Sequence, residues 1–147
     1  MHTIEARQAF ADTVRTTRAG STRLIWTGRV MSGIAVLFLL FDSIGKLLEV
    51  QPVIDGTLQL GYPRDVVFTL GAILLSCVVA YVIPRTSVIG AVLLTGYLGG
   101  AIATHVRVAN PLFTHVLFPV YVAALLWGGL MLRDARLRVF LPVRRAS

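Results

Sequence analysis

Four long segments of this chain carry almost no charged residues, and they limit its fold more than any other feature of the sequence. They run over about residues 24–48, 66–83, 88–105 and 112–132. Helices of these lengths, at about 1.5 Å of rise per residue, cover the roughly 30 Å hydrocarbon core of a bilayer. The segments are too long for strands and do not alternate apolar with polar residues. The sequence therefore predicts an all-α membrane domain of four transmembrane helices, residues 24–132.

Charge is scarce in the whole chain because these segments exclude it. Of the 147 residues, 14% are charged and 56% are hydrophobic, whereas soluble domains carry about 25% charged residues. The length allows one domain. The single cysteine, Cys77, lies inside an apolar segment. The chain alone therefore cannot form a disulfide, a CxxC redox pair or a cysteine-rich metal site.

Basic residues are distributed unequally along the chain. A polar, basic tail, residues 1–23, precedes the first segment, and a second basic tail, residues 133–147, follows the last. The connection 84–87 is short enough to require a tight turn, so we expect an antiparallel bundle. Both tails and this turn then share one side, which holds eleven Lys and Arg residues against three on the other. The positive-inside rule predicts a multi-pass protein of the inner (cytoplasmic) membrane with both termini in the cytoplasm.

The remaining connections carry weaker signals. Residues 1–23 are expected to form a short surface helix or to stay disordered. Residues 50–65, which contain Pro52 and Gly61, are expected to form a loop. The net charge of +7 follows from topology, because no basic face is interleaved with aromatic residues as in nucleic-acid-binding proteins. The predicted partner is therefore the lipid bilayer and not nucleic acid.

Ionisable and histidine side chains gather near the outer ends of three segments. Asp42 and Lys46 are spaced i, i+4, which predicts an ion pair, and Glu49 at i+7 is expected to share their helix face. Ionisable groups at membrane depth usually turn inward and mark a site. The alternative is that they reach water and fix the helix ends. The predicted polar cluster, a candidate binding site without an assigned catalytic residue, consists of Asp42, Lys46, His105, Arg107 and His115.

Small residues form a stripe along the third segment. Residues of this kind at i, i+4 and i+7 allow close approach of a second helix. A neighbouring stripe, Tyr97 and Ala101 with His105, is expected to line a cavity. The predicted helix-packing residues are Gly96, Gly100 and Ala103.

The fourth segment contains a proline near its beginning. Pro119 has no N–H and crowds the carbonyl group of His115, so a kink is expected there. His105 and His115 have a spacing that two ligands of one metal would allow. No CxxCH motif and no carboxylate at ligand spacing accompany them, so no metal or haem is predicted. Nucleotide-binding glycine loops and nucleophile motifs are absent from the sequence, so the chain is not expected to be an enzyme on its own.

Short motifs follow one another in a characteristic order. They are Trp26-Thr27-Gly28-Arg29, Phe41-Asp42-Ser43-Ile44-Gly45-Lys46, Gly61-Tyr62-Pro63, Pro84-Arg85-Thr86, Gly96-Tyr97-Leu98-Gly99-Gly100-Ala101, Ala103-Thr104-His105-Val106-Arg107, Asn110-Pro111, Thr114-His115, Phe118-Pro119-Val120-Tyr121 and Leu126-Trp127-Gly128-Gly129. With these motifs the chain resembles the DoxX-like family of small bacterial membrane proteins over about residues 24–142. The resemblance implies a four-helix integral membrane protein. The wider group includes a subunit of an archaeal thiosulfate:quinone oxidoreductase and proteins linked to membrane-associated oxidative-stress complexes.

Three functions are compatible with these features. The first is a membrane subunit or accessory protein of a quinone-linked or oxidative-stress redox complex, whose polar cluster contacts a quinone head group or a partner. The second is a small transporter or channel, although no polar path crosses the predicted bundle. The third is a structural membrane protein whose polar cluster only stabilises the helices. A quinone is the cofactor that the resemblance suggests, and the expected protein partners are a second copy of the chain or a membrane redox protein.

Overall fold

The computed structural model describes the backbone of residues 2–134 and 137 and the side chains from residue 22 onward. These residues form helices and no strands. The predicted basic tail 133–147 lies almost wholly outside the described residues, including Arg136, Arg138, Arg144 and Arg145. Four helical segments are long and apolar enough to cross a membrane, namely Thr22–Leu47, Arg64–Val82, Ser87–Arg107 and Leu112–Arg133. They agree with the predicted spans to within a few residues.

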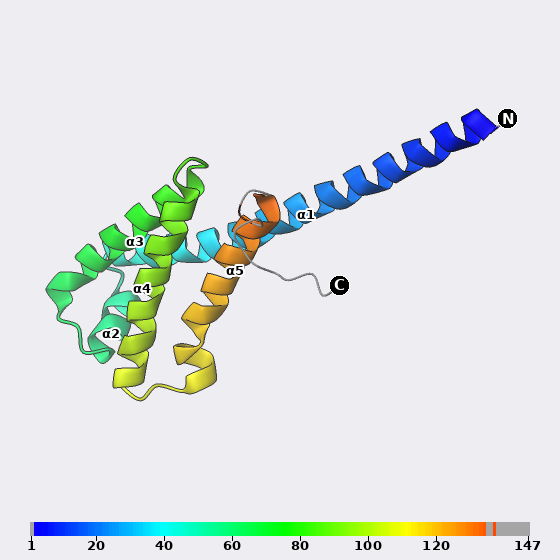
Figure 1. Ribbon diagram of the computed structural model, residues 1–147. Coiled ribbons are helices and arrows are strands. Elements are labelled where there is room, and N and C mark those ends of the chain that lie inside the picture. Colours follow the sequence, from blue (N-terminus) through cyan, green and yellow to red (C-terminus); the bar gives the residue numbers. More distant parts are fainter. Residues whose placement is uncertain (1, 135–136, 138–147) are drawn as a thin grey trace.

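The first helix is much longer than its membrane segment. α1 runs without a break from His2–Leu47, and its N-terminal part projects well beyond the other helices (Figure 1). The predicted tail 1–23 is therefore a continuation of the first span and not a separate element. The first proline of the chain is Pro52, so no residue before it removes a helical N–H or crowds the preceding turn.

The predicted loop 50–65 contains a helix, which corrects the expectation from sequence. α2 runs from Gln51–Gln59, and a 3-10 turn, η1, follows at Arg64–Val66. Pro52 lies in the first turn of α2, where a missing N–H costs nothing because that group has no partner within the helix. The proline that suggested a loop therefore begins a helix.

The remaining spans follow with short connections. α3 covers Val67–Val82 and α4 covers Ser87–Arg107. The fourth span is divided, as Pro119 predicted. It begins with one π-helical turn, η2, at Leu112–Val116, and continues as α5 at Phe118–Arg133. Pro119 lies in the first turn of α5, so the break comes before the proline.

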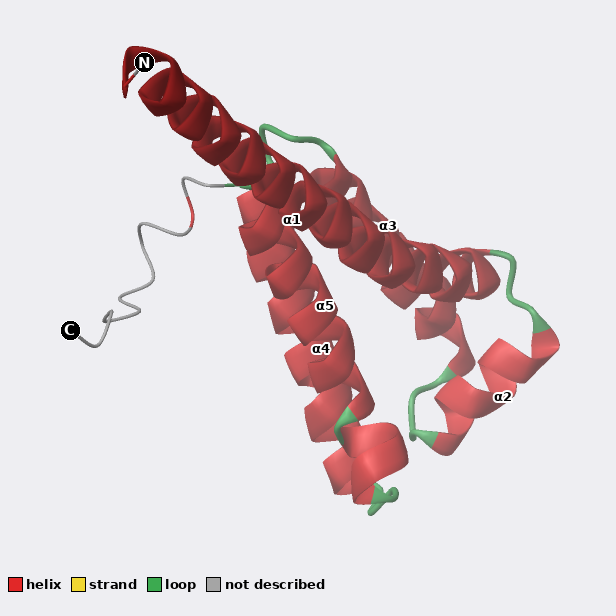
Figure 2. Ribbon diagram, turned by 90° about the vertical axis from the view of Figure 1, so that its right-hand side faces the viewer, coloured by secondary structure: helices red, strands yellow, loops and turns green. Residues whose placement is uncertain are grey.

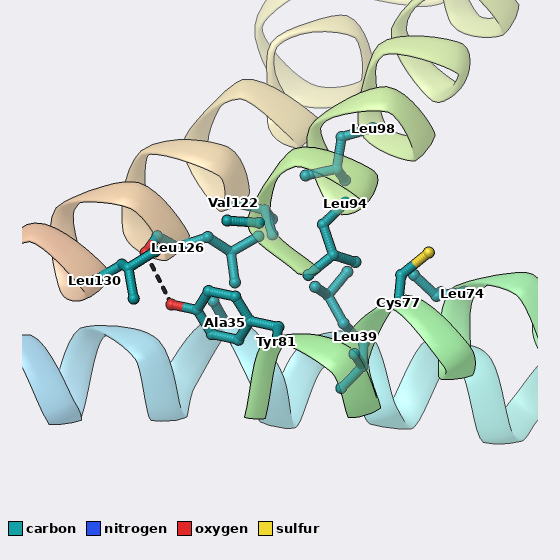
Figure 3. Close-up of a cluster of buried hydrophobic side chains, with 12 residues drawn as sticks. Ala35, Leu39, Leu74, Cys77, Tyr81, Leu94, Leu98, Val122, Leu126 and Leu130 are labelled. Atoms are coloured by element: carbon teal, nitrogen blue, oxygen red, sulfur yellow. Dashed lines mark hydrogen bonds between the residues drawn. The ribbon is translucent and has the colours of Figure 1, made fainter. Parts of the chain in front are cut away.

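The four long helices close a ring around one apolar core. α1 packs against α3 and α5, and α4 packs against the same two helices. Figure 3 shows the core side chains meeting between α1, α3, α4 and α5. The central residues, each at most 2% exposed, are Ala35, Leu39, Leu74, Val78, Tyr81, Ala91, Leu94, Leu126 and Leu130.

Three helix pairs are in contact at glycines. We call the end of the bundle that contains Gly28, Gly129 and Tyr81 the tight half. A Cβ added at Gly28 would lie 2.7 Å from the carbonyl oxygen of Gly129, and one added at Gly129 would lie 2.8 Å from that of Gly28. Gly71 approaches the backbone of α1 in the same way, and Gly90 approaches α3 at Tyr81. Small residues at these positions let the backbones meet.

A buried tyrosine connects three helices of the tight half. Tyr81 of α3 has no exposed surface. Its hydroxyl group donates to the carbonyl oxygen of Leu126 in α5 at 2.8 Å (Figure 3). It is also hydrogen-bonded to Ser32 Oγ in α1 at 2.8 Å. The guanidinium group of Arg133 lies over the ring, 5.1 Å from its centroid. The hydroxyl group of Tyr81 therefore has two hydrogen-bond partners inside the core, and these two bonds fix the relative positions of the three helices.

Candidate functional site

The end of the bundle away from Tyr81 contains a cavity of about 660 Å³ that is partly open, and we call this region the cavity half. Its wall comes from the last turns of α1, from α2, from the second half of α4, and from η2 with the start of α5. Most of the wall is apolar. It includes Phe38 and Phe118, whose rings meet edge to face with centroids 5.0 Å apart. Four of the five residues of the polar cluster line this cavity, namely Asp42, Lys46, His105 and His115.

The predicted ion pair is present at the end of α1. Lys46 Nζ donates to Asp42 Oδ1, one helical turn away. The side chains are 13% and 32% exposed, respectively, so the pair lies partly within the wall. Because the two charges oppose each other, the pair adds polarity to the cavity without adding net charge. Glu49 does not share this face, because α1 ends at Leu47 and Glu49 adopts a left-handed conformation with φ of 48°.

Two histidines from neighbouring elements meet at the cavity wall. The rings of His105, in the last turn of α4, and His115, in η2, lie edge to face with centroids 5.7 Å apart. The amide group of Asn110 donates to His105 Nδ1 at 2.9 Å, and Thr114 Oγ1 is hydrogen-bonded to His115 Nδ1 at 2.8 Å. Since each Nδ1 is occupied by a local partner, each Nε2 is the nitrogen left to bind a ligand.

The turn after α4 explains how Asn110 reaches His105. Ala109 adopts a left-handed conformation, with φ of 55°. The N–H of Asn110 then donates to the carbonyl oxygen of His105 at 3.0 Å, and the N–H of Ala109 donates to that of Val106 at 3.1 Å. This pair of bonds is the Schellman ending of a helix, in which glycine usually occupies the left-handed position. The chain reverses there and brings both the backbone and the side chain of Asn110 to His105.

Tyrosines complete the polar lining, and one of them was missed by the sequence analysis. Tyr97, Ala101 and His105 all line the cavity, as their spacing predicted. Tyr62 lines it as well, and its hydroxyl group is hydrogen-bonded to Thr104 Oγ1 at 3.0 Å. Tyr62 follows the unpredicted helix α2, so no periodic signal placed it opposite α4.

Arg107, the fifth residue of the polar cluster, does not line the cavity. Its guanidinium group donates to the carbonyl oxygen of Leu60 at 2.6 Å. Leu60 is the C-terminal cap of α2, where a positive side chain is favoured by the partial negative charge of the helix end. Arg107 therefore connects the end of α4 to the end of α2.

The glycine stripe of α4 has a different environment from the one predicted. A Cβ added at Gly96 or Gly100 would meet nothing within 4 Å, and both residues line the cavity. Ala103 is exposed. No other helix of the described chain packs closely against these glycines. Their missing side chains leave the cavity open instead.

The sequence comparison identifies the family. A model of the DoxX-like family matches residues 30–129. The chain belongs to the DoxX-like family. The matched region contains all five residues of the polar cluster and reaches from α1 to α5. Together with the four apolar helices, it makes this DoxX-like chain a multi-pass integral membrane protein. No curated protein and no solved structure matches the chain.

The chemistry that this DoxX-like cavity offers is hydrogen bonding. No group of three or more His, Cys, Asp or Glu side chains gathers at one point among the described residues. The polar groups along the wall include one ammonium group, two imidazole rings and the phenol group of Tyr97. They project from a wall that is mostly apolar. Cavities of about 300–1,000 Å³ with this character typically bind small molecules.

Proposed function

We propose that this DoxX-like protein is a membrane subunit or accessory protein that binds the head group of a quinone in the cavity. The observation that carries the proposal is the arrangement of one ion pair and two oriented histidines around a largely apolar space of about 660 Å³. A quinone head group is flat, uncharged and apolar except for its two carbonyl oxygens. It therefore matches a wall with hydrogen-bond donors and no net charge from its ion pair.

The donors come from separate elements, which suits a ligand with two acceptors. The ammonium group of Lys46 belongs to α1, whereas the imidazole rings belong to α4 and η2. Phe38 and Phe118 supply aromatic surface beside them. The proposed role is binding, and electron transfer would involve a partner protein, because this chain has a single cysteine and cannot form a redox-active dithiol pair.

The test compares quinone binding by two variants in which one of two adjacent glycines is replaced by leucine. Gly100 lines the cavity and Gly99 does not, yet an added Cβ meets nothing within 4 Å at either position. We expect purified protein in nanodiscs to bind decylubiquinone. Gly100→Leu should weaken binding by roughly tenfold or more, because it fills space that a ligand must occupy. Gly99→Leu should leave binding unchanged. Equal affinities in the two variants, or no binding by the unmodified protein, would refute the proposal.

We also propose that the four helices alternate in direction and that both termini are cytoplasmic. The support is the asymmetry of eleven basic residues against three. Under this topology the cavity half lies toward the outer face of the inner membrane. Reporter fusions after Arg85 and after Asn110 would test it. An alkaline phosphatase reporter should be active after Asn110 and inactive after Arg85, and the reverse pattern would contradict the orientation.

A further inference from the structure

One wall of the cavity is a short helix that has few neighbours. α2 has an inward face made of Val53, Ile54, Thr57 and Leu60, and both Ile54 and Thr57 are buried. Its outward face is mostly polar, with a hydrogen bond from Gln51 Nε2 to Asp55 Oδ1 at 2.8 Å, and also includes Leu58, which is 43% exposed. The main neighbours of α2 are α1 and η1. It is therefore an amphipathic helix lying on the cavity and not a member of the four-helix ring.

Both ends of α2 are joined to the bundle through left-handed residues. Glu49 precedes it with φ of 48°, and Gly61 follows it with φ of 80°. Figure 2 shows α2 set apart from the long helices with a loop at each end. Left-handed single residues mark sharp changes of chain direction. They give α2 two short connections about which it can turn as one body.

Two hydrogen bonds attach the chain at the far end of α2 to α4, one before Gly61 and one after it. Arg107 Nη2 donates to the carbonyl oxygen of Leu60 at 2.6 Å, and the Tyr62 hydroxyl group is bonded to Thr104 Oγ1 at 3.0 Å. Arg107 lies on the exposed side of this contact and does not line the cavity. Its side chain therefore holds the position of α2 and leaves the cavity interior to other groups.

We propose that α2 is a lid over the cavity, hinged at Glu49 and Gly61 and latched to α4 by Arg107, while Tyr62 anchors the chain beyond the second hinge. When the latch opens, the inward face of α2 leaves the cavity and a polar head group enters from the side that α2 covers. The inference rests on the proposed function only in naming a quinone head group as the molecule that enters. The proposed movement depends on α2 and its contacts with α4 and does not depend on which ligand binds.

The test measures how fast a buried residue of α2 becomes accessible, with no ligand present. Thr57→Cys is a near-isosteric change at a position that is 5% exposed, and the native Cys77 of α3 is 7% exposed. A membrane-impermeant maleimide and peptide mass spectrometry report the two thiols separately. Arg107→Ala and Tyr62→Phe are each introduced beside Thr57→Cys. Arg64→Ala, which removes an exposed arginine of the same connection, is the matched control.

We expect Arg107→Ala to raise the labelling rate at position 57 by roughly tenfold, as the loss of a charged hydrogen bond implies. Tyr62→Phe should raise it less, and Arg64→Ala should leave it unchanged. Cys77 should stay protected in all three variants. An unchanged rate at position 57 in Arg107→Ala would overturn the proposal. Equal acceleration at position 57 and at Cys77 would also overturn it, because the latch would then hold the bundle and not the lid. Since no quinone is used, failure of quinone binding leaves this result interpretable.

Discussion

The tight half and the cavity half of the molecule use glycine in opposite ways. At Gly28 and Gly129 the missing side chains let α1 and α5 touch, with backbone atoms closer than any Cβ would allow. At Gly96 and Gly100 the missing side chains leave a space that no helix of the described chain fills. The comparison shows that a stripe of small residues predicts a close approach only where a partner helix is present. The glycines between α1 and α5 close the bundle, and those on the cavity side of α4 keep the cavity open.

The largest expected effect distinguishes a glycine that allows helix contact from a glycine that leaves the cavity open. Gly129→Ala should lower the free energy of unfolding by about 2–3 kcal/mol, because the added Cβ overlaps the backbone of α1. Gly96→Ala should leave stability unchanged or raise it by up to about 1 kcal/mol, since alanine favours helix and the space is free. Denaturant unfolding followed by circular dichroism in detergent micelles measures both. Similar losses for the two variants would remove the distinction between the halves.

The hydrogen bonds of Tyr81 provide a second test of the tight half. Tyr81→Phe removes the hydroxyl group that bonds to Ser32 and Leu126. We expect a loss of about 1–2 kcal/mol in unfolding free energy, because buried polar partners remain without a bond. Tyr121→Phe is the control, since Tyr121 is 49% exposed. If both variants unfold alike, the three-helix connection does not stabilise the bundle.

Variants of the ion pair between Asp42 and Lys46 provide a test of the cavity half. Asp42→Asn and Lys46→Met should each destabilise the protein, and the double variant should be tolerated better than the sum of the two. The expected coupling is about 0.5–1 kcal/mol, because the pair is partly exposed and screened. A double-mutant cycle of unfolding free energies measures it. Strict additivity would show that the two charges stabilise the fold independently.

The smallest expected effect concerns the turn that positions Asn110 beside His105. Ala109→Gly should raise the free energy of unfolding by about 0.5–1 kcal/mol, because glycine adopts the left-handed conformation without steric cost. Ala103→Gly, inside α4, should lower it by a similar amount. In thermal unfolding, Ala109→Gly should therefore raise the melting temperature and Ala103→Gly should lower it. A loss of stability on Ala109→Gly would contradict it.

Much of the fold followed from local features of the sequence. Long uncharged segments predicted the four spans, and the spacing of Asp42 and Lys46 predicted their pair, because both depend on helix geometry alone. α2 was missed because its proline was interpreted as a loop signal and the helix is short. The partner of Arg107 was missed for the same reason, since Leu60 belongs to that helix. The environment of Gly96 and Gly100 depends on which helix lies opposite, and helix spacing within one segment does not contain that information.

The unbroken course of α1 has a mechanical consequence. A helix of 46 residues is about 69 Å long, more than twice the roughly 30 Å thickness of a hydrocarbon core. No proline or loop interrupts α1 between His2 and Leu47, so one continuous helix joins the projecting part to the last turn, which carries Lys46. Because Asp42 and Lys46 line the cavity and belong to this same helix, a tilt of α1 as a rigid body would also change the position of the cavity wall.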